Sequence, residues 1–209
     1  MGYPLPPRPN QLASSLQGLA YWMGYRASYF HSYPLAEAAL VAEACNLIQS
    51  NLNENQILRP EVLYRRLADI DRKAVGRKRA DLTILSNECP DPYKHEVFEH
   101  VEAVIEFKRG STSEALVNDD LKRLLLFKRS CNRRARAFLV VASEGALPDR
   151  FVEDQGVSRL HPHPIPGTKG IYHVRRTVKA SPTFARTSSA HYVCIVEVFT
   201  AENDYWPLE

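Results

Sequence analysis

Three side chains, Asp81, Glu106 and Lys108, have the types and spacing that metal-assisted hydrolysis requires. Successive side chains of a strand alternate between its faces, so Glu106 and Lys108 project together while Phe107 points into the opposite layer. Asp81 lies on the preceding apolar stretch. Two acids from adjacent strands can share one divalent cation, which also binds water and a substrate phosphate. Lys108 would then lie beside a water molecule bound to that cation.

The sequence context separates this triplet from similar ones. The D-x-K triplets at 71–73 and 120–122 carry the same residue types. The first lies in a polar, basic stretch, and the second lies in a predicted helix, where residues i and i+2 do not share a face. Only Glu106-Phe107-Lys108 follows an apolar strand that another acid-bearing strand precedes. The alternative interpretation is a surface ion-pair patch on an edge strand, with Arg109 as a salt-bridge partner.

The elements that must position these residues alternate between helix and strand. Pro34 suits a helix start, and the alanine- and leucine-rich segment 35–51 after it predicts a buried helix. The capping box Ser111-x-x-Glu114 predicts a helix that runs to about Ser130. Apolar patterns predict strands at 79–85, 101–108, 136–142 and 192–199, a strand or short helix at 61–67, and loops at 86–96 and 161–167. This alternation predicts an α/β domain.

Length and composition indicate one intracellular domain with an N-terminal appendage. The chain has 209 residues, of which 44% are hydrophobic and 24% charged. Residues 1–33 are rich in proline and aromatic residues and predict an arm, with a short helix over 11–23, that packs on the domain at 34–209 or on a partner. No apolar run approaches the roughly 20 residues that span a bilayer. The four cysteines have no zinc spacing and are typical of reduced thiols, so we expect a cytoplasmic protein without a membrane partner.

Positive charge is concentrated in two segments. Segment 59–79 holds eight basic and three acidic residues, and segment 121–136 holds seven basic residues and no acid. Basic clusters of this density commonly contact phosphate backbones, although a solvated helix face is the alternative. The residues that we expect to contact nucleic acid are Arg77, Lys78, Arg79, Lys122, Arg123, Arg129 and Arg133.

Asp81 and Glu106-x-Lys108 on consecutive strands between helices resemble the PD-(D/E)XK nuclease superfamily, which has the restriction-endonuclease-like fold. The resemblance covers about residues 34–142. It implies an αβββαβ core whose central mixed sheet is flanked by helices, and a Mg²⁺ or Mn²⁺ ion held by Asp81, Glu106 and the Phe107 carbonyl. Many members carry a further metal-binding acid on the first helix, and Glu43 is the expected match because its helical neighbours are apolar.

Glu37 competes with Glu43 for that role, but it lies in the first turn, where the helix dipole alone explains an acid. The chain departs from the family pattern at Ala80, where proline is common, and in the 25 residues that separate Asp81 from Glu106. The loop over 86–96 has the composition of an insertion that would fill this gap.

The expected function is metal-dependent hydrolysis of phosphodiester bonds, with DNA favoured over RNA as the substrate. Lys108 would orient the attacking water and offset charge in the transition state. A non-catalytic nucleic-acid-binding or assembly subunit on the same fold is the alternative, with the N-terminal arm joining a homodimer or a larger complex. An enzyme acting on small molecules is a third hypothesis. The chain contains no Walker loop, G-x-G-x-x-G or G-x-S-x-G motif.

Overall fold

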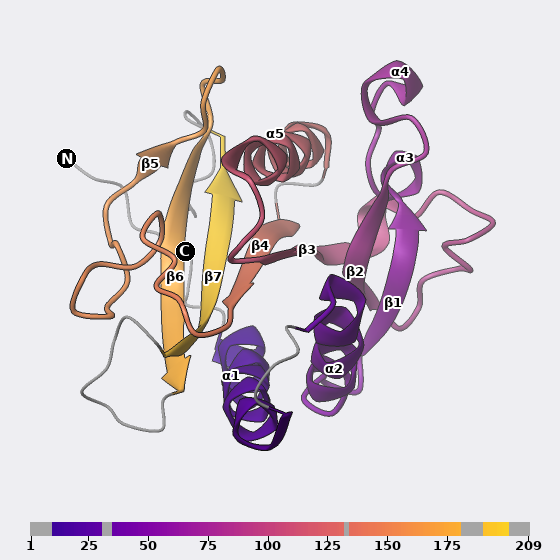
Figure 1. Cartoon of the computed structure of the whole chain (residues 1–209). Helices are drawn as coiled ribbons and strands as arrows, with labels where there is room; N and C mark the ends of the chain where they lie inside the picture. The colour runs from indigo at the N-terminus through magenta and orange to yellow at the C-terminus, as the bar shows by residue number, and fades with distance from the viewer. Residues whose placement is uncertain (1–9, 31–34, 132–133, 181–189, 201–209) are drawn as a thin grey trace, which may run out of the picture.

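The computed structural model describes residues 10–30, 35–131, 134–180 and 190–200. Its centre is a seven-stranded mixed sheet with the spatial order β1-β2-β3-β4-β7-β6-β5 (Figure 1). The strands are β1 (Gln56–Leu63), β2 (Arg79–Ser86), β3 (Val101–Arg109), β4 (Arg136–Ser143), β5 (His163–Pro164), β6 (Ile171–Ala180) and β7 (His191–Phe199). The helices are α1 (Asn10–Phe30), α2 (Glu37–Gln49), α3 (Tyr64–Leu67), α4 (Arg72–Val75), η1 (Phe98–His100) and α5 (Glu114–Ser130).

Strands β3 and β4 form the parallel pair at the centre of the sheet, whereas the other neighbouring strands are antiparallel. A parallel connection needs a crossover, and α5 supplies it by returning the chain from the end of β3 to the start of β4. The prediction of an α/β domain with a mixed sheet flanked by helices is therefore confirmed. The segment 61–67 combines both of its predicted states, because β1 ends at Leu63 and α3 begins at Tyr64.

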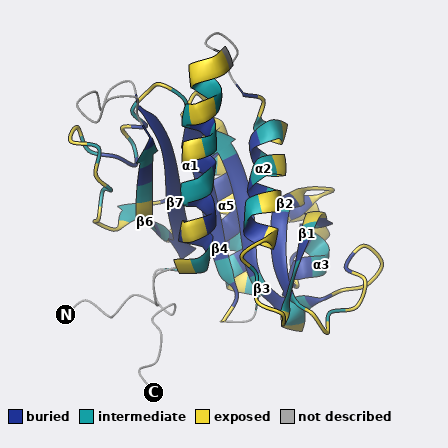
Figure 2. Ribbon diagram, turned by 90° about the horizontal axis from the view of Figure 1, so that it is seen from below, coloured by how far each residue is buried: buried dark blue, intermediate teal, exposed yellow. Residues whose placement is uncertain are grey.

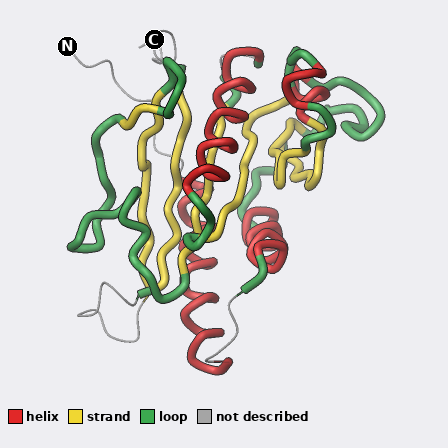
Figure 3. The backbone as a smooth tube through the Cα atoms, turned by 45° about the horizontal axis from the view of Figure 1, so that its top comes forward, coloured by secondary structure: helices red, strands yellow, loops and turns green. Residues whose placement is uncertain are grey.

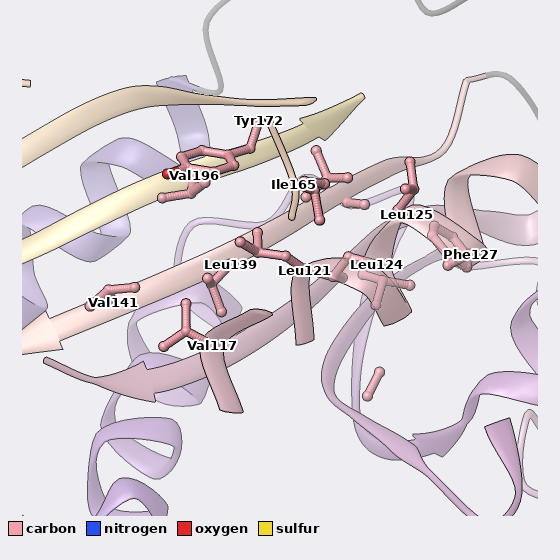
Figure 4. Close-up of a cluster of buried hydrophobic side chains, with 14 of the residues drawn as sticks. Val117, Leu121, Leu124, Leu125, Phe127, Leu139, Val141, Ile165, Tyr172 and Val196 are labelled. Atoms are coloured by element: carbon pink, nitrogen blue, oxygen red, sulfur yellow. The ribbon is translucent and has the colours of Figure 1, made fainter. Parts of the chain in front are cut away.

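The sheet separates two hydrophobic cores. Helix α5 covers one face, and its buried side chains, including Leu121 and Leu124, pack toward Leu139 and Val141 of β4 (Figure 4). Helices α1 and α2 cover the other face, where Ile105 and Phe107 of β3 belong to the second core. The alternation predicted for β3 is confirmed, because Glu106 and Lys108 contact residues of α5 on the first face.

Helix α1 is longer than the predicted helix over 11–23 and belongs to the core. Its buried residues, among them Leu16, Leu19 and Met23, join the same hydrophobic cluster as α2 and the sheet. Figure 2 shows this helix with its buried side toward the strands and its exposed side outward. Residues 10–30 therefore pack on the domain, which is one of the two placements expected of the N-terminal segment, and their apolar face completes the second core; residues 1–9 and 31–33 lie outside the described residues. No helix in the described ranges is long and apolar enough to cross a bilayer.

The segment after β4 is the part of the fold that the sequence analysis did not anticipate. Residues 144–162 form loops beside the β5–β6 edge of the sheet (Figure 3). Within the predicted loop at 161–167, His163 and Pro164 pair with Tyr172 and Ile171 as the short strand β5. That pairing extends the sheet by one edge strand.

Replacement of Leu19 by alanine tests whether α1 is part of the core. Leu19 is fully buried, so Leu19→Ala should lower the free energy of unfolding by about 2–5 kcal/mol. Tyr21 is 57% exposed on the same helix, and Tyr21→Ala should change stability by no more than about 0.5 kcal/mol. Chemical denaturation of both variants measures the difference. Equal, small effects would mean that α1 is an independent appendage.

Candidate active site

Asp81 and Glu106 face each other where β2 and β3 stop pairing. The β2–β3 ladder ends at the pair Leu82↔Ile105, and the same register places Asp81 opposite Glu106. Beyond this pair the acceptor is a side chain instead of a backbone carbonyl, because Asp81 Oδ2 accepts a 2.7 Å hydrogen bond from the Phe107 N–H group. Two carboxyl groups are thereby fixed side by side at the carboxyl end of β3.

Glu106 is 2% exposed, and two donors hold it. Its Oε1 atom accepts hydrogen bonds from the Tyr64 hydroxyl at 2.6 Å and from Arg123 Nε at 3.2 Å. Tyr64 comes from α3, directly after β1, and Arg123 comes from α5. Burial, together with the charges of Asp81 and Asp120, raises the pKa of Glu106 to about 8 against the lowering effects of Arg123 and Tyr64. Glu106 is therefore predominantly protonated at neutral pH when no added cation is bound.

Asp81, the second carboxyl group of the pair, also has a raised pKa. Burial raises its pKa above the ordinary value, while the hydrogen bond from Phe107 and the charge of Lys108 work to lower it. The charge of Glu37 adds to the increase. Two facing carboxyl groups with raised pKa values favour either a shared proton or a bound cation.

Lys108 lies between three oxygen atoms of the protein. Its Nζ atom donates hydrogen bonds to the Phe107 carbonyl at 2.7 Å and to Glu37 Oε1 at 3.0 Å, and it lies 3.0 Å from Asp120 Oδ2. Burial works to lower the pKa of Lys108, but the carboxylates of Asp120 and Glu37 outweigh burial and raise it. Lys108 is consequently a fixed ammonium ion rather than a proton acceptor.

Arg123 and Asp120 complete the network from one turn of α5. Arg123 Nη2 contacts Asp120 Oδ1 while Arg123 Nε contacts Glu106. These contacts join six ionisable groups into what we call the carboxylate cluster, namely Glu37, Asp81, Glu106, Asp120, Lys108 and Arg123. With every member ionised, four negative charges face two positive charges. The cluster therefore has a formal charge of −2, which protons or one divalent cation can balance.

The carboxylate cluster borders a cleft of about 600 Å³, whose lining does not include Asp81 or Glu106. Ala74, Val75 and Lys78, in and after α4, form one wall, and Leu116, Lys122 and Leu126 of α5 contribute to the other. Figure 1 shows α4 and α5 at the same end of the sheet. Glu37, Lys108, Asp120 and Arg123 also line the cleft. A ligand in the cleft therefore meets Lys78 and Lys122 as well as the carboxylates of Glu37, Asp119 and Asp120.

The donor set fits a small site for a hard cation. Mg²⁺ is usually bound by one or two carboxylates and keeps several waters, which Asp81 and Glu106 can satisfy. The Phe107 carbonyl already accepts from Lys108 but has a second lone pair. In the described part of the chain, no group of three or more His, Cys, Asp and Glu side chains is arranged as a metal site. The candidate site therefore consists of two carboxylates and, at most, one carbonyl.

The structure brings Glu37, not Glu43, to the carboxylate cluster. The buried residues of α2 are Leu40, Ala44 and Ile48, and Glu37 continues this stripe because it lies three and seven residues before the first two. Glu43 directly precedes Ala44 and lies about a third of a turn from the stripe. The apolar neighbours of Glu43 led to the prediction that this residue is the acid of α2 at the site. The position of Glu37 along the buried stripe would have identified it instead.

The predicted basic residues divide between the interior and the surface. Arg123 is committed to Glu106 and Asp120 and is 15% exposed, so the expectation that it grips nucleic acid is replaced by an internal role. The exposed members are Arg77, Lys78, Arg79, Lys122 and Arg129, while Arg133 lies outside the described residues. Arg123 turns inward because it lies on the stripe that carries Asp120, Leu124 and Phe127 toward the sheet.

Tyr64 and Asp120 are site residues that the sequence analysis missed. Asp120 lies between Val117 and Leu121 on the buried stripe of α5, and an acid within such a stripe requires a partner. That signal was readable from the sequence. Tyr64 had no such signal in the sequence, because its position depends on the turn from β1 into α3.

Comparison of this chain with family models, with curated proteins and with solved structures gives no match.

The raised pKa of Glu106 predicts a pH dependence of stability in EDTA. The folded protein holds a proton on Glu106 up to about pH 8, whereas the unfolded chain releases it near the ordinary value of 4.5. Folding thus retains a proton between these limits, and the stability that this provides is lost as pH rises through the window, by up to about 1.4 kcal/mol per pH unit. Glu106→Gln removes this dependence.

The measurement is the free energy of unfolding of wild type and Glu106→Gln at intervals from pH 5 to pH 8. We expect the variant to gain on wild type as pH rises. Glu88→Gln, in an exposed loop, is the control for loss of one carboxylate. A constant difference between wild type and Glu106→Gln would show that Glu106 titrates normally.

Proposed function

We propose that the protein is a metal-dependent nuclease of the PD-(D/E)XK type, with DNA favoured as the substrate. The observation that carries this proposal is the excess of carboxyl groups in the carboxylate cluster, whose formal charge is −2 when every member is ionised, beside a fixed lysine that lines a cleft with a lysine on each wall. The element order α2-β1-β2-β3-α5-β4 is the αβββαβ order expected of a restriction-endonuclease-like core, apart from the short helices α3, α4 and η1.

Asp81 and Glu106 are the residues proposed to hold the ion, with the Phe107 carbonyl as a third donor. When bound, Mg²⁺ or Mn²⁺ supplies Lewis-acid activation of water and neutralises charge on the phosphate. With Asp81 and Glu106 both ionised, this pair would supply two carboxylates to the ion. Arg123 and Tyr64 keep Glu106 oriented toward Asp81 by occupying its Oε1 atom.

Lys108 is proposed to orient the attacking water and to stabilise the charge that develops on the phosphate. Its ammonium group is held by Glu37 and Asp120, so it reaches the reaction already positioned. Glu37 and Asp120 are positioning residues in this scheme, because they act through Lys108 and Arg123. Their contacts with these cations keep a fixed positive charge beside the metal-binding carboxylates.

The walls of the cleft are proposed to bind the phosphate backbone. Lys78 precedes β2 on one wall, and Lys122 projects from α5 on the other. Arg77, Arg79 and Arg129 are exposed and extend the basic surface. Contacts of this kind position a nucleic acid without reading its bases and weaken as the salt concentration rises.

One observation favours the alternative of a non-catalytic binding subunit on the same fold. Glu106 is almost completely buried, and both cations of the carboxylate cluster are already paired with carboxylates. A cluster balanced by protons alone would stabilise the fold without binding metal. The two proposals differ in one outcome, which is cleavage that requires a divalent cation.

A cleavage assay tests the proposed function. Supercoiled plasmid, linear duplex and single-stranded oligonucleotides are incubated with the protein in Mg²⁺, Mn²⁺ or EDTA. We expect cleavage with either metal and none in EDTA. Glu106→Gln and Lys108→Ala should each lower the initial rate on the order of 100-fold or more, because they remove a metal ligand and a transition-state charge.

Lys169→Ala, an exposed lysine before β6, is the matched control and should retain the wild-type rate. Circular dichroism of each variant checks that it is folded. Binding of DNA without cleavage in any metal would support the non-catalytic alternative. Full activity of folded Glu106→Gln or Lys108→Ala would exclude this site as the active site.

A further inference from the structure

A second pocket, of about 370 Å³, lies beside α4, other residues of which line the cleft. It is lined by Arg65, Arg66, Arg72, Lys94, His95 and Glu96, which we call the arginine pocket. At about 30 Å³ for each water, it has room for roughly a dozen waters, or for an oxyanion with part of its hydration shell. Three chain segments build it, namely α3, the start of α4 and the loop that precedes η1.

The arginine pocket has positive charge without matching negative charge. Among the described residues, Arg65, Arg66 and Arg72 form no ion pair with a carboxylate, in contrast to Arg123 and Arg175, whose guanidinium groups contact acids. Lys94 pairs with Asp91 at 3.3 Å, and Glu96 is the acid in the lining. Three guanidinium groups around one cavity repel one another, so an anion bound between them would be stabilising.

The backbone fixes the position of Arg66, and its side chain contains an unsatisfied donor. The Val97 N–H group donates a 2.8 Å hydrogen bond to the Arg66 carbonyl, which docks the loop onto α3. Arg66 Nε is buried and has no hydrogen-bond partner. A buried donor without an acceptor is destabilising, and a ligand oxygen within reach would remove this cost.

We propose that the arginine pocket binds a backbone phosphate of the polynucleotide substrate, away from the phosphate that is cleaved. This inference rests on the proposed function, which identifies the phosphate as part of a polynucleotide. Arginine suits the role because its planar fork of N–H donors matches the oxygens of a phosphate group. Arg65, Arg66 and Arg72 would each contribute one face of the binding site.

The position of α4 links the arginine pocket to the cleft. Arg72, at the start of α4, lines the arginine pocket, whereas Ala74 and Val75, at its end, line the cleft. A nucleic-acid strand that crosses this short helix can therefore contact both sites. Substrate binding would then depend on chain length, because a strand too short to cross α4 reaches only one of them.

The test measures binding rather than cleavage, in EDTA and at several salt concentrations. A fluorescent duplex is titrated with wild type and with the triple variant Arg65→Gln/Arg66→Gln/Arg72→Gln, and fluorescence anisotropy gives the affinity. We expect the variant to bind about tenfold more weakly, with the slope of log affinity against log salt flatter by about 1, as the loss of one phosphate contact requires. Duplexes with 5′-phosphate or 5′-hydroxyl ends distinguish a terminal phosphate from a backbone phosphate.

The matched control is Lys169→Gln/Arg176→Gln/Lys179→Gln, which removes the same charge beside or within β6, at the opposite end of the sheet from β1. It should keep the wild-type slope. Equal losses of affinity in both triple variants would show that only net charge matters and would overturn the inference. Wild-type affinity and slope in the triple arginine variant would also overturn it. Loss of binding in the arginine variant without cleavage by wild type would refute the proposed nuclease and leave the arginine pocket supported. Failure of wild type to bind any duplex would overturn both.

Discussion

The structure depends on the enclosure of more carboxyl groups than cations at the end of the β2–β3 ladder. Asp81 and Glu106 are brought together by strand register, and neither can ionise freely beside the other. The surrounding elements supply the polar side chains that stabilise the two carboxyl groups. Helix α3 directs Tyr64 to Glu106, and α5 interrupts its apolar stripe with Asp120 and Arg123. The carboxyl pair therefore explains why Tyr64, Asp120 and Arg123 occupy buried or half-buried positions.

The topology places this pair beside a cleft that Lys108, Asp120 and Arg123 line. The parallel β3–β4 connection requires α5 to start beyond the carboxyl end of β3, so the first turns of α5 overhang Lys108. The opposite wall comes from the excursion between β1 and β2, which contains α3 and α4. Both walls carry a lysine, Lys78 on one and Lys122 on the other, and Asp119 of α5 also lines the cleft. A polyanion would therefore be attracted by the walls, while the cluster beneath attracts cations.

Sequence patterns predicted most of the elements but only part of the contacts. The strands that carry Asp81 and Glu106 and the helix before Ser130 were readable, because their apolar patterns have clear periods and ends. Glu37, Asp120 and Tyr64 required knowledge of which helix faces meet the end of β3. Strand β6 was missed because Arg175 and Arg176 interrupt its apolar pattern, and the Arg175 side chain is neutralised by Glu197 at 3.1 Å on β7. Such compensation comes from distant residues and leaves no local signal.

The central claim is that the carboxylate cluster exchanges protons for a divalent cation. Isothermal titration calorimetry of Mn²⁺ binding at pH 7, in two buffers with different ionisation enthalpies, counts both the ions bound and the protons released. We expect one ion per chain, proton release on binding, and loss of both in Asp81→Asn and Glu106→Gln. Binding without proton release, or binding that survives both substitutions, would contradict this claim.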